Sequence, residues 1–342
     1  MNTQICNGIN LCPQSWDAKH VDWNIKPTLF MLIGIPGSGK SHFAQKYVKE
    51  NEQVVIVSSD AIRAELFGDE SDQSDNAKVF QVAHSRIKHY LREGVSVVFD
   101  ATNISKKRRA AFLAELKNIP CHKMAVAVMT PYEVCVQRNE NRDRSVPKSA
   151  IRKMYLNWEP PYIGEGFDET FLIYGCEDEA LEKYIIFNLV NNSASFMNLD
   201  QENYHHTRTL GMHCVSAAVY CMEVFPHKPQ LALAALLHDT GKAFTKSRMN
   251  HKGVEDGNCH YYQHHCVSAY DSLFYLRKVA LSMFEKIYIA NLIFYHMHPH
   301  RNWKDSPKAV QRDKKLMGID EDYIYDLYKD IKILHYADCA AQ

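Results

Sequence analysis

The 342-residue sequence lacks several features that would place the protein in a specialised class. None of its ten cysteines belongs to a C-x-x-C pair, which excludes the common zinc-finger and redox motifs. No apolar run approaches the roughly 18 residues of a membrane-spanning helix, and the amino terminus does not have the pattern of a secretory signal. The formal net charge is zero, so only local basic patches could bind nucleic acid. We therefore expect a cytoplasmic protein with reduced thiols and no membrane partner.

What the sequence does contain divides into two halves of different pattern. Between residues 28 and 175, short apolar segments (Thr28–Ile33, Val54–Val57, Val95–Phe99 and Ala125–Met129) alternate with helical ones (Ser41–Glu50, Asn76–Glu93 and Lys106–Lys117). This alternation predicts an α/β domain with a parallel sheet flanked by helices. Beyond residue 200, helical patterns dominate and an all-α domain is expected; they cover Thr207–Val224, Leu231–Asp239, His264–Leu276, Ser282–His296 and Asp320–Ala341.

Three parts follow from this change of pattern. Residues 1–26 have no clear periodicity and form an extension of unknown role. Residues 27–190 are the α/β domain, and residues 200–342 are the helical domain. The join lies near Asn191–Gln201, a stretch rich in Asn and Ser.

The segment Gly34–Ser41, GIPGSGKS, matches the phosphate-binding pattern G-x-x-x-x-G-K-[ST] at every fixed position. It follows an apolar strand and opens a predicted helix, which is the context that this motif requires. Lys40 would reach the β- and γ-phosphates, and the Ser41 hydroxyl would help to hold Mg²⁺. The backbone N–H groups around the phosphates would come from Gly34, Gly37, Ser38 and Gly39. The sequence therefore predicts that the protein binds ATP or another NTP with Mg²⁺.

Polar residues follow the next two strands at the edge where a parallel sheet binds its ligands. Asp60 could accept a proton from an attacking hydroxyl, and it could also be the N-cap of a helix over residues 61–66. Arg63 lies one helical turn further and could clamp a phosphate of the acceptor. Asp100 stands where an aspartate would hold Mg²⁺ through water, and Thr102 and Asn103 are expected to face the same crevice as substrate-binding groups.

Two basic segments lie further along this half. Lys106–Arg109 (KKRR) is predicted to be a solvated helix face. Arg138 and Arg142 are four residues apart on one helical face, ahead of Pro147. Such an arginine cluster is typical of a lid that closes on the nucleotide and stabilises the charge of phosphoryl transfer.

In this order, GIPGSGKS, SSDAIR, VFDATN and RNENRDRSVP resemble the phage-type polynucleotide 5′-hydroxyl kinase family over residues 28–175. The resemblance implies that Asp60 is the general base toward a 5′-hydroxyl and that Arg63 contacts a phosphate of the nucleic acid. It implies that the lid arginine is Arg142, with Arg144 as the alternative. Small-molecule kinases of the gluconate and antibiotic types share the loop and some lid features, so the acceptor stays open at this point.

The second half concentrates histidines in short motifs. LGMH, LLHDTGK and HYAD occur in this order and resemble the HD phosphohydrolase superfamily over residues 205–342. The resemblance implies one metal held by His213, His238, Asp239 and Asp338, and a second held with the help of His264 and His296. Lys242, just after the His-Asp pair, could hold a substrate phosphate. Imidazole and carboxylate ligands suit Mn²⁺, Ni²⁺, Co²⁺, Fe²⁺ or Zn²⁺, which would activate a bound water.

These patterns together predict a bifunctional enzyme that heals nucleic-acid ends, with RNA the expected substrate. The kinase would phosphorylate 5′-OH ends, and the HD domain would process 2′,3′-cyclic phosphate or 2′/3′-phosphate ends before a ligase acts. One alternative is a small-metabolite kinase fused to an HD nucleotidase. Another is a nucleotide-sensing regulatory module in which the HD domain only binds.

Overall fold

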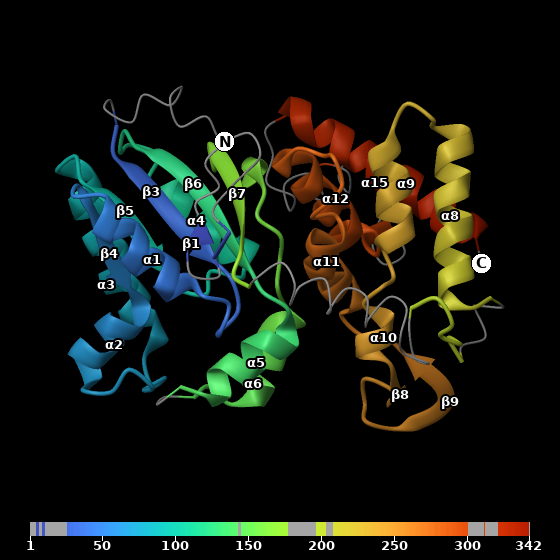
Figure 1. The fold of residues 1–342 in the computed structure, drawn as a ribbon, viewed down its shortest axis with the longest axis horizontal. Coiled ribbons are helices and arrows are strands. Elements are labelled where there is room, and N and C mark those ends of the chain that lie inside the picture. Colours follow the sequence, from blue (N-terminus) through green and yellow to red (C-terminus); the bar gives the residue numbers. More distant parts are fainter. Residues whose placement is uncertain are drawn as a thin grey trace. The chain divides into compact units, whose positions relative to one another are not determined.

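The structure is a computed structural model that describes residues 5–6, 9–10, 26–142, 145–176, 196–202, 208–299, 311 and 321–341. The chain forms two compact units, shown as ribbons in Figure 1. The first comprises Met1–Met154 and Pro161–Glu177, and the second comprises Tyr155–Pro160 and Asp178–Gln342. The domain boundaries expected at residues 27, 190 and 200 stay predictions, because residues 177–195 lie outside the described ranges.

The first unit is built on one sheet with the strand order β1-β2-β7-β6-β3-β5-β4. The five strands from β7 to β4 are parallel, as the alternation of apolar and helical segments predicts. Two short strands from the amino-terminal extension add to the β7 edge in antiparallel fashion. The strands are β1 (Ile5–Cys6), β2 (Ile9–Asn10), β3 (Thr28–Ile33), β4 (Val54–Ser58), β5 (Ser96–Asp100), β6 (His122–Met129) and β7 (Glu169–Tyr174).

Helices cover both faces of this sheet (Figure 1). The helices along this part of the chain are α1 (Lys40–Glu50), α2 (Ser59–Phe67), α3 (Asn76–Arg92), α4 (Lys106–Glu115), α5 (Tyr132–Glu140), α6 (Lys148–Tyr155) and the short 3₁₀ helix η1 (Ile163–Glu165). The helices expected over residues 41–50, 76–93 and 106–117 are confirmed to within two residues at each end.

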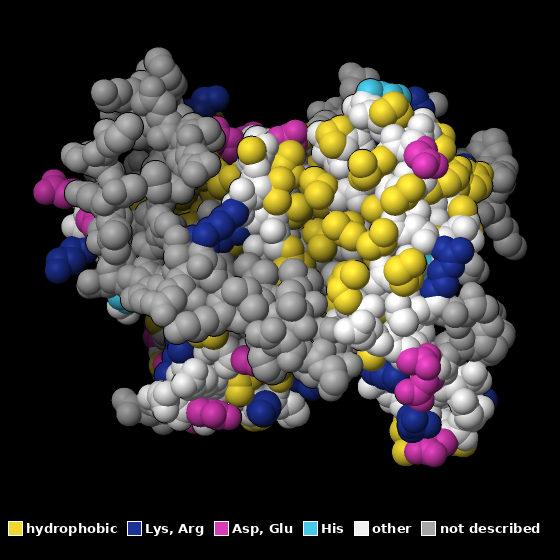
Figure 2. All heavy atoms as spheres, turned by 45° about the vertical axis from the view of Figure 1, so that its right-hand side comes forward, with side chains coloured by type: hydrophobic (Ala, Val, Ile, Leu, Met, Phe, Trp, Pro, Cys, Tyr) yellow, Lys and Arg dark blue, Asp and Glu magenta, His cyan; other side chains and the backbone are white. Residues whose placement is uncertain are grey.

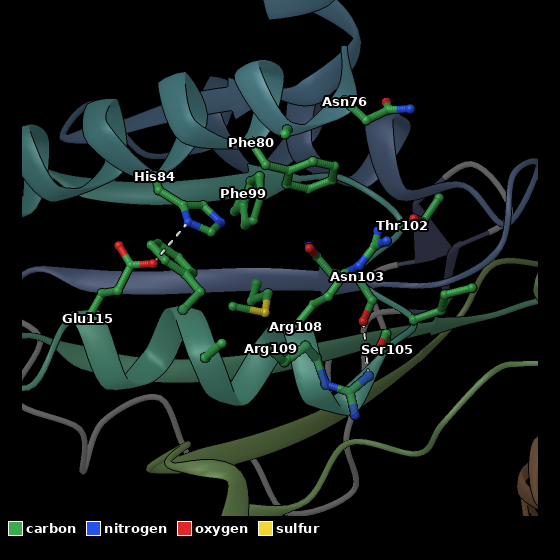
Figure 3. Close-up of a pocket in the computed structure, with 15 residues that line it drawn as sticks. Asn76, Phe80, His84, Phe99, Thr102, Asn103, Ser105, Arg108, Arg109 and Glu115 are labelled. Atoms are coloured by element: carbon green, nitrogen blue, oxygen red, sulfur yellow. Dashed lines mark hydrogen bonds and ion pairs between the residues drawn. The ribbon is translucent and has the colours of Figure 1, made fainter. Parts of the chain in front are cut away.

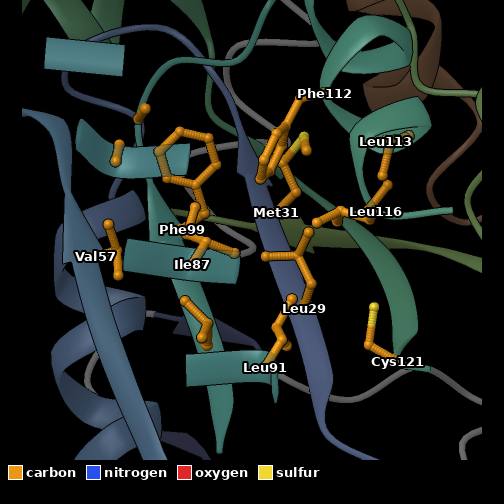
Figure 4. Packing of buried hydrophobic residues seen from close by; sticks show 14 of the residues in the cluster. Leu29, Met31, Val57, Ile87, Leu91, Phe99, Phe112, Leu113, Leu116 and Cys121 are labelled. Carbon is orange, nitrogen blue, oxygen red and sulfur yellow. The ribbon is translucent and has the colours of Figure 1, made fainter. Parts of the chain in front are cut away.

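Strand β3 is buried on both faces, because its side chains alternate between two cores. Leu29 and Met31 pack in one core with residues of β5, α3 and α4, and Figure 4 shows this cluster. Phe30 and Leu32 pack in the other core, with Phe43 and Ala44 of α1. The helix that opens after the Gly-rich loop therefore lies on one face of the sheet, while α3 and α4 lie on the other.

The basic run of α4 is not the solvated face that the sequence suggests. Lys106 and Arg109 are 7% and 1% exposed, while Lys107 and Arg108 are exposed. Residues three apart lie on the same side of a helix, so this pair faces inward. Arg109 ends in a buried ion pair with Glu165 of η1, at 2.7 Å.

The described part of the second unit is mainly helical, as the sequence predicts. It also contains a two-stranded hairpin, so it is not the all-α domain that was expected. Helix α8 packs on α9 and α15, and α11 packs on α12. The elements are α8 (Leu210–Val224), α9 (Pro229–Leu237), α10 (Lys242–Thr245), β8 (Ser247–Met249), β9 (Glu255–His260), α11 (His264–Tyr275), α12 (Met283–Tyr295) and α15 (Glu321–Ala340).

Apolar side chains also reach the surface of the helical unit in the view of Figure 2. On α8, Met212 and Met222 are exposed. No helix among the described residues combines the length and apolarity needed to cross a bilayer. The eight cysteines from Cys121 to Cys339 are free thiols.

Candidate functional site

The Gly-rich loop between β3 and α1 needs glycine for both conformation and space. Gly37 and Gly39 have φ angles of +85° and +101°, which side chains with a Cβ adopt only at a cost. A Cβ on Gly37 would lie 2.3 Å from the carbonyl oxygen of Cys135. From the other side, the Thr130 hydroxyl donates to the Ser38 carbonyl over 2.9 Å. The loop is thus held in a conformation that larger residues would disrupt.

Lys40 places its ammonium inside this loop. Its Nζ donates to the Ile35 carbonyl over 2.9 Å and lies 3.4 Å from the Ser38 hydroxyl. Burial lowers the pKa of Lys40, and the carboxylates of Asp100 and Asp60 oppose that shift. The cation is therefore enclosed by the loop that would hold nucleotide phosphates, with two predicted acidic residues near it.

Asp60 and Arg63 form an ion pair at the start of α2, with 2.6 Å between Oδ1 and Nη1. The interpretation of Asp60 as a helix N-cap is wrong, because the cap is Ser58, whose hydroxyl accepts from the Ala61 N–H. Asp60 is 54% exposed, while Arg63 is nearly buried. Its Nη2 donates to the Asn76 side chain over 3.0 Å. An exposed carboxylate beside an anchored guanidinium can meet a hydroxyl and an adjacent phosphate together.

The end of β5 lies beside the start of α2, because Ser58 pairs with Asp100 in the parallel register. Three residues on, Asn103 has a left-handed φ of +45°. Its side-chain amide donates to the Leu32 carbonyl over 2.8 Å, which ties this turn to β3. Gly34 N–H also donates to the Thr102 carbonyl over 3.0 Å. The turn after β5 is therefore fastened to the strand and loop that precede α1.

The two predicted lid arginines lie near the loop. Arg138 Nη1 is 4.0 Å from the position that a Cβ would take on Gly39. The charge of Arg142, an exposed residue, further lowers the pKa of Lys40. Arg144, the alternative lid residue, lies outside the described ranges. The predicted nucleotide-binding residues thus converge on the Gly-rich loop.

A cavity of about 400 Å³ lies on the sheet face that carries α3 and α4. Figure 3 shows the side chains of Phe80, His84 and Phe99 in it. The predicted substrate residues Thr102 and Asn103 line the same cavity. The sequence analysis did not predict this cavity. Phe80 and His84 are four residues apart on one helical face, and this aromatic pair could have indicated it.

In the second unit, the six predicted metal ligands gather in one buried cluster. His213 Nε2 lies 3.2 Å from His238 Nε2 and 3.1 Å from Asp338 Oδ1. His264 Nε2 lies 3.3 Å from His296 Nε2. Ligand atoms that share a metal at ~2.0–2.2 Å stand about 3–3.6 Å apart, so these spacings fit one ion in each group.

Asp239 joins the two groups through its two carboxylate oxygens. Oδ2 lies 3.4 Å from His238 Nε2 and 3.6 Å from His213 Nε2. Oδ1 lies 3.1 Å from His264 Nε2 and 3.6 Å from His296 Nε2. This buried Oδ1 makes no hydrogen bond within the described residues. A bridging carboxylate between two cations would satisfy both oxygens.

The orientation of the four imidazoles suits a cation between them. Each Nδ1 lies 2.6–3.3 Å from a backbone carbonyl. A carbonyl only accepts, so each Nδ1 donates a hydrogen and each Nε2 is directed into the cluster. A divalent cation could be ligated by the two Nε2 atoms that lie 3.2–3.3 Å apart in each pair. Burial also lowers the pKa of His296 to about 4, which keeps its ring neutral. The donor set therefore fits divalent transition metals.

Lys242 lies against this cluster rather than in open solvent. Its Nζ is 2.6 Å from Asp239 Oδ2 and donates to Gln201 Oε1 over 2.8 Å. Burial alone would raise the pKa of Asp239, but the ammonium of Lys242 holds that pKa well below its usual range. Two further histidines of this half are not among the predicted ligands: His265 packs against Phe294, and His300 lies outside the described residues.

Comparison with known proteins bears on the first unit. Residues 29–161 match the family of AAA domains. The first unit is a P-loop kinase-like α/β domain. A 137-residue segment, 39% of this chain and 53% of the relative, is 25% identical to L-seryl-tRNA(Sec) kinase of Methanococcus maripaludis. A 172-residue segment, 46% of this chain and 37% of the relative, is 30% identical to a putative bifunctional polynucleotide phosphatase/kinase of Acanthamoeba polyphaga mimivirus.

Among solved structures, the Pnkp1/Rnl/Hen1 RNA repair complex is similar at 26% identity, with a TM-score of 0.34, over 38% of this chain and 43% of that chain. The chain spans about half, or less, of the lengths of these relatives. L-seryl-tRNA(Sec) kinase and the putative polynucleotide phosphatase/kinase are both named as kinases, in agreement with the kinase-like fold of the first unit.

Proposed function

We propose that the protein heals nucleic-acid ends with two activities. The first unit is an ATP-dependent kinase for 5′-hydroxyl ends. The second is a metal-dependent phosphohydrolase of the HD type that acts on 2′,3′-cyclic phosphate or 2′/3′-phosphate ends. The observation that carries the kinase assignment is the Asp60–Arg63 pair at 2.6 Å, at the sheet edge next to the loop that encloses Lys40.

The kinase step needs a base, an acceptor clamp and charge stabilisation, and the chain offers a residue for each. Asp60 takes the proton of the attacking hydroxyl as its oxygen bonds to the γ-phosphorus and the bond to ADP breaks. Arg63 binds the phosphate that follows the first nucleoside of the acceptor. Lys40 and Arg142 stabilise the charge on the transferred group. Ser41 and Asp100 would hold Mg²⁺, which would offset phosphate charge.

The hydrolase assignment rests on the buried cluster of four imidazoles and two carboxylates. Divalent metal ions bound there would lower the pKa of a water and polarise the phosphoryl oxygen. Asp239 would bridge the two ions, and Lys242 is positioned to meet a substrate phosphate next to them. Carbonyl partners on each Nδ1 hold the four rings in the orientation that ligation needs.

The two activities match the two ends of one break. Cleavage of RNA by transesterification leaves a 5′-hydroxyl on one fragment and a 2′,3′-cyclic phosphate on the other. A kinase and a phosphohydrolase on one chain would convert both ends, and a ligase would then consume them. Two relatives, a seryl-tRNA kinase and a putative polynucleotide phosphatase/kinase, support a nucleic-acid acceptor.

The kinase is tested by transfer of label from [γ-³²P]ATP with Mg²⁺ to a 5′-OH RNA oligonucleotide. Asp60→Asn keeps the size and the contact with Arg63 but removes the base, so transfer should fall by about 10²–10⁴-fold. Glu65→Gln is the matched control, because Glu65 is an equally exposed carboxylate of α2 that pairs with Arg86 of α3; it should transfer at the normal rate.

Two outcomes would overturn the kinase assignment. If Asp60→Asn transfers label as fast as the control, Asp60 is not the base. If label goes to a small metabolite and to neither RNA nor DNA, the first unit is a small-metabolite kinase. Hydrolysis of ATP without any acceptor would contradict both.

The phosphohydrolase is tested with elemental analysis and a 2′,3′-cyclic nucleotide. We expect the purified protein to carry a transition metal and to open the cyclic phosphate. Asp239→Asn should lose both properties, whereas His260→Ala, outside the cluster and paired with Asp256, should keep both. Bound metal without turnover would favour a regulatory binding module instead.

A further inference from the structure

We propose that the cavity between α3 and α4 receives the base of the acceptor's terminal nucleoside. This inference rests on the proposed kinase and deepens it, because it assigns a specificity site to the acceptor.

The cavity belongs to the acceptor and not to the nucleotide donor. Phe99 and Phe112 line it and are part of the core that includes Met31. Phe43 and Ala44 of α1, the helix that follows the phosphate-binding loop, pack in the core on the other face of the sheet. The donor's phosphates are expected at that loop, so a pocket beneath α3 and α4 is left for the second substrate.

Arg63 links the cavity to the catalytic edge. One end of its guanidinium lies 2.6 Å from Asp60, and the other donates to Asn76 over 3.0 Å. Asn76 begins α3 and lines the cavity. A ligand whose reactive hydroxyl lies at Asp60 and whose phosphate lies at Arg63 would have its next substituent at the mouth of this cavity. In a nucleotide, that substituent is the base.

The lining suits a flat aromatic ring. Figure 3 shows Phe80 and His84, both on α3, with Phe99 of β5 beside them. The rings of His84 and Phe112 stack with 3.8 Å between centroids, which forms a rigid wall. Thr102 and Arg108 provide polar groups at the boundary. Sites for small molecules are commonly ~300–1,000 Å³ with an apolar lining and a few polar groups, and this cavity of about 400 Å³ is within that range.

The same lining disfavours a sugar acid as the acceptor. A polyol presents hydroxyl groups in every direction, and each would need a partner once buried. Phenylalanine rings provide none. A nucleobase instead has two apolar faces and a polar edge, so it can stack on the rings and direct its edge to Thr102 and Arg108.

The test compares two acceptors and three proteins. The full-length chain would phosphorylate a 5′-OH RNA hexamer and the same hexamer whose first ribose carries no base. Phe80→Leu removes an aromatic face while keeping an apolar side chain. Val82→Ala, on the same helix and against the same core but outside the cavity lining, is the matched control. KM and kcat would be measured for both hexamers, together with KM for ATP.

For the wild type, we expect the KM of the base-free hexamer to be about 5- to 150-fold higher, the range that stacking of one base provides. Phe80→Leu should raise the KM of the normal hexamer toward the base-free value and leave the base-free KM and the ATP KM unchanged. Val82→Ala should retain the wild-type ratio.

Equal KM values for the two hexamers in the wild type would overturn the inference, and this comparison needs no variant to fold. A Phe80→Leu protein that loses affinity equally for both hexamers would also overturn it. If neither hexamer accepts phosphate, the proposed kinase itself fails, which is a different result from phosphorylation without a preference.

Discussion

The buried ion pair between Arg109 and Glu165 offers a sharp test of how the cavity wall is held. Both guanidinium-to-carboxylate hydrogen bonds are 2.7 Å long, and the two side chains are 1% and 0% exposed. Arg109 also donates to the backbone carbonyl of Asn103 over 2.9 Å. The pair therefore connects α4, η1 and the turn after β5.

Glu165→Gln would leave the Arg109 charge buried and only partly paired. Removing one partner of a buried ion pair costs about 3–5 kcal/mol. An exposed pair of the same chemistry is worth about 0–1 kcal/mol. Glu65 and Arg86, 2.5 Å apart and 55% and 41% exposed, form such a pair in the same unit. Glu65→Gln should therefore cost several-fold less than Glu165→Gln.

Native-state hydrogen exchange followed by mass spectrometry would measure both variants, because it reports on peptides of the first unit separately from the second. The slowest amides of β3 and β5 should exchange about two to more than three orders of magnitude faster in Glu165→Gln, since about 1.4 kcal/mol is a factor of ten. Exchange that is no faster than in Glu65→Gln would refute the reasoning that burial makes this pair important.

Three further predictions follow from single positions. Gly37→Ala should weaken ATP binding about tenfold or more by calorimetry, because of its φ of +85° and its contact with Cys135; Gly68→Ala, also at positive φ but with open space around its Cβ, should bind normally. Burial lowers the pKa of His84, with Glu115 opposing the shift, so below its usual pKa His84 binds protons more readily in the unfolded state. The contribution of His84 to the free energy of unfolding should therefore be constant above about pH 7 and decrease as the pH falls below 6.5. In His84→Asn, the free energy of unfolding, measured at several pH values, should decrease less at low pH than in the wild type. An equal decrease in the two proteins would contradict the prediction. Gly241→Ala would put a Cβ 2.4 Å from the His264 carbonyl, so elemental analysis should find less bound metal, and full occupancy would show that α10 and α11 can separate without cost.

Periodicity and motif context predicted much of the first unit. Continuous apolar runs such as Thr28–Ile33 are needed wherever a strand is covered on both faces, so β3 and β5 were visible in the sequence. β7 and the two strands of the extension were not predicted; β1 and β2 have two residues each, too few for a periodic pattern. The exposure of Lys106–Arg109 was also misjudged. Charge predicts exposure on average, but Arg109 can be buried because Glu165, 56 residues away in the sequence, pairs with its charge.

The candidate sites divide in the same way. Gly34–Ser41 could be recognised because a phosphate-binding loop is local, and all its groups lie in consecutive residues. The buried histidine–aspartate cluster could be suggested by the order of its motifs, but its six residues span positions 213–338, so only packing of α8, α9, α11, α12 and α15 could bring the side chains together. The choice of Ser58 over Asp60 as the helix cap required backbone geometry that spacing does not carry.

The sequence by itself determined what depends on neighbours along the chain: the phosphate-binding loop, the alternation that makes a parallel sheet, and the residue types suited to metal ligation. The tertiary structure alone decided what depends on distant partners: the position of Asp239 between the two imidazole pairs, the burial of Arg109, and the cavity between α3 and α4. The physical reason is that hydrogen-bonded turns and helices are local, whereas a pocket or a ligand cluster is defined by the close packing of segments that the chain separates by many residues.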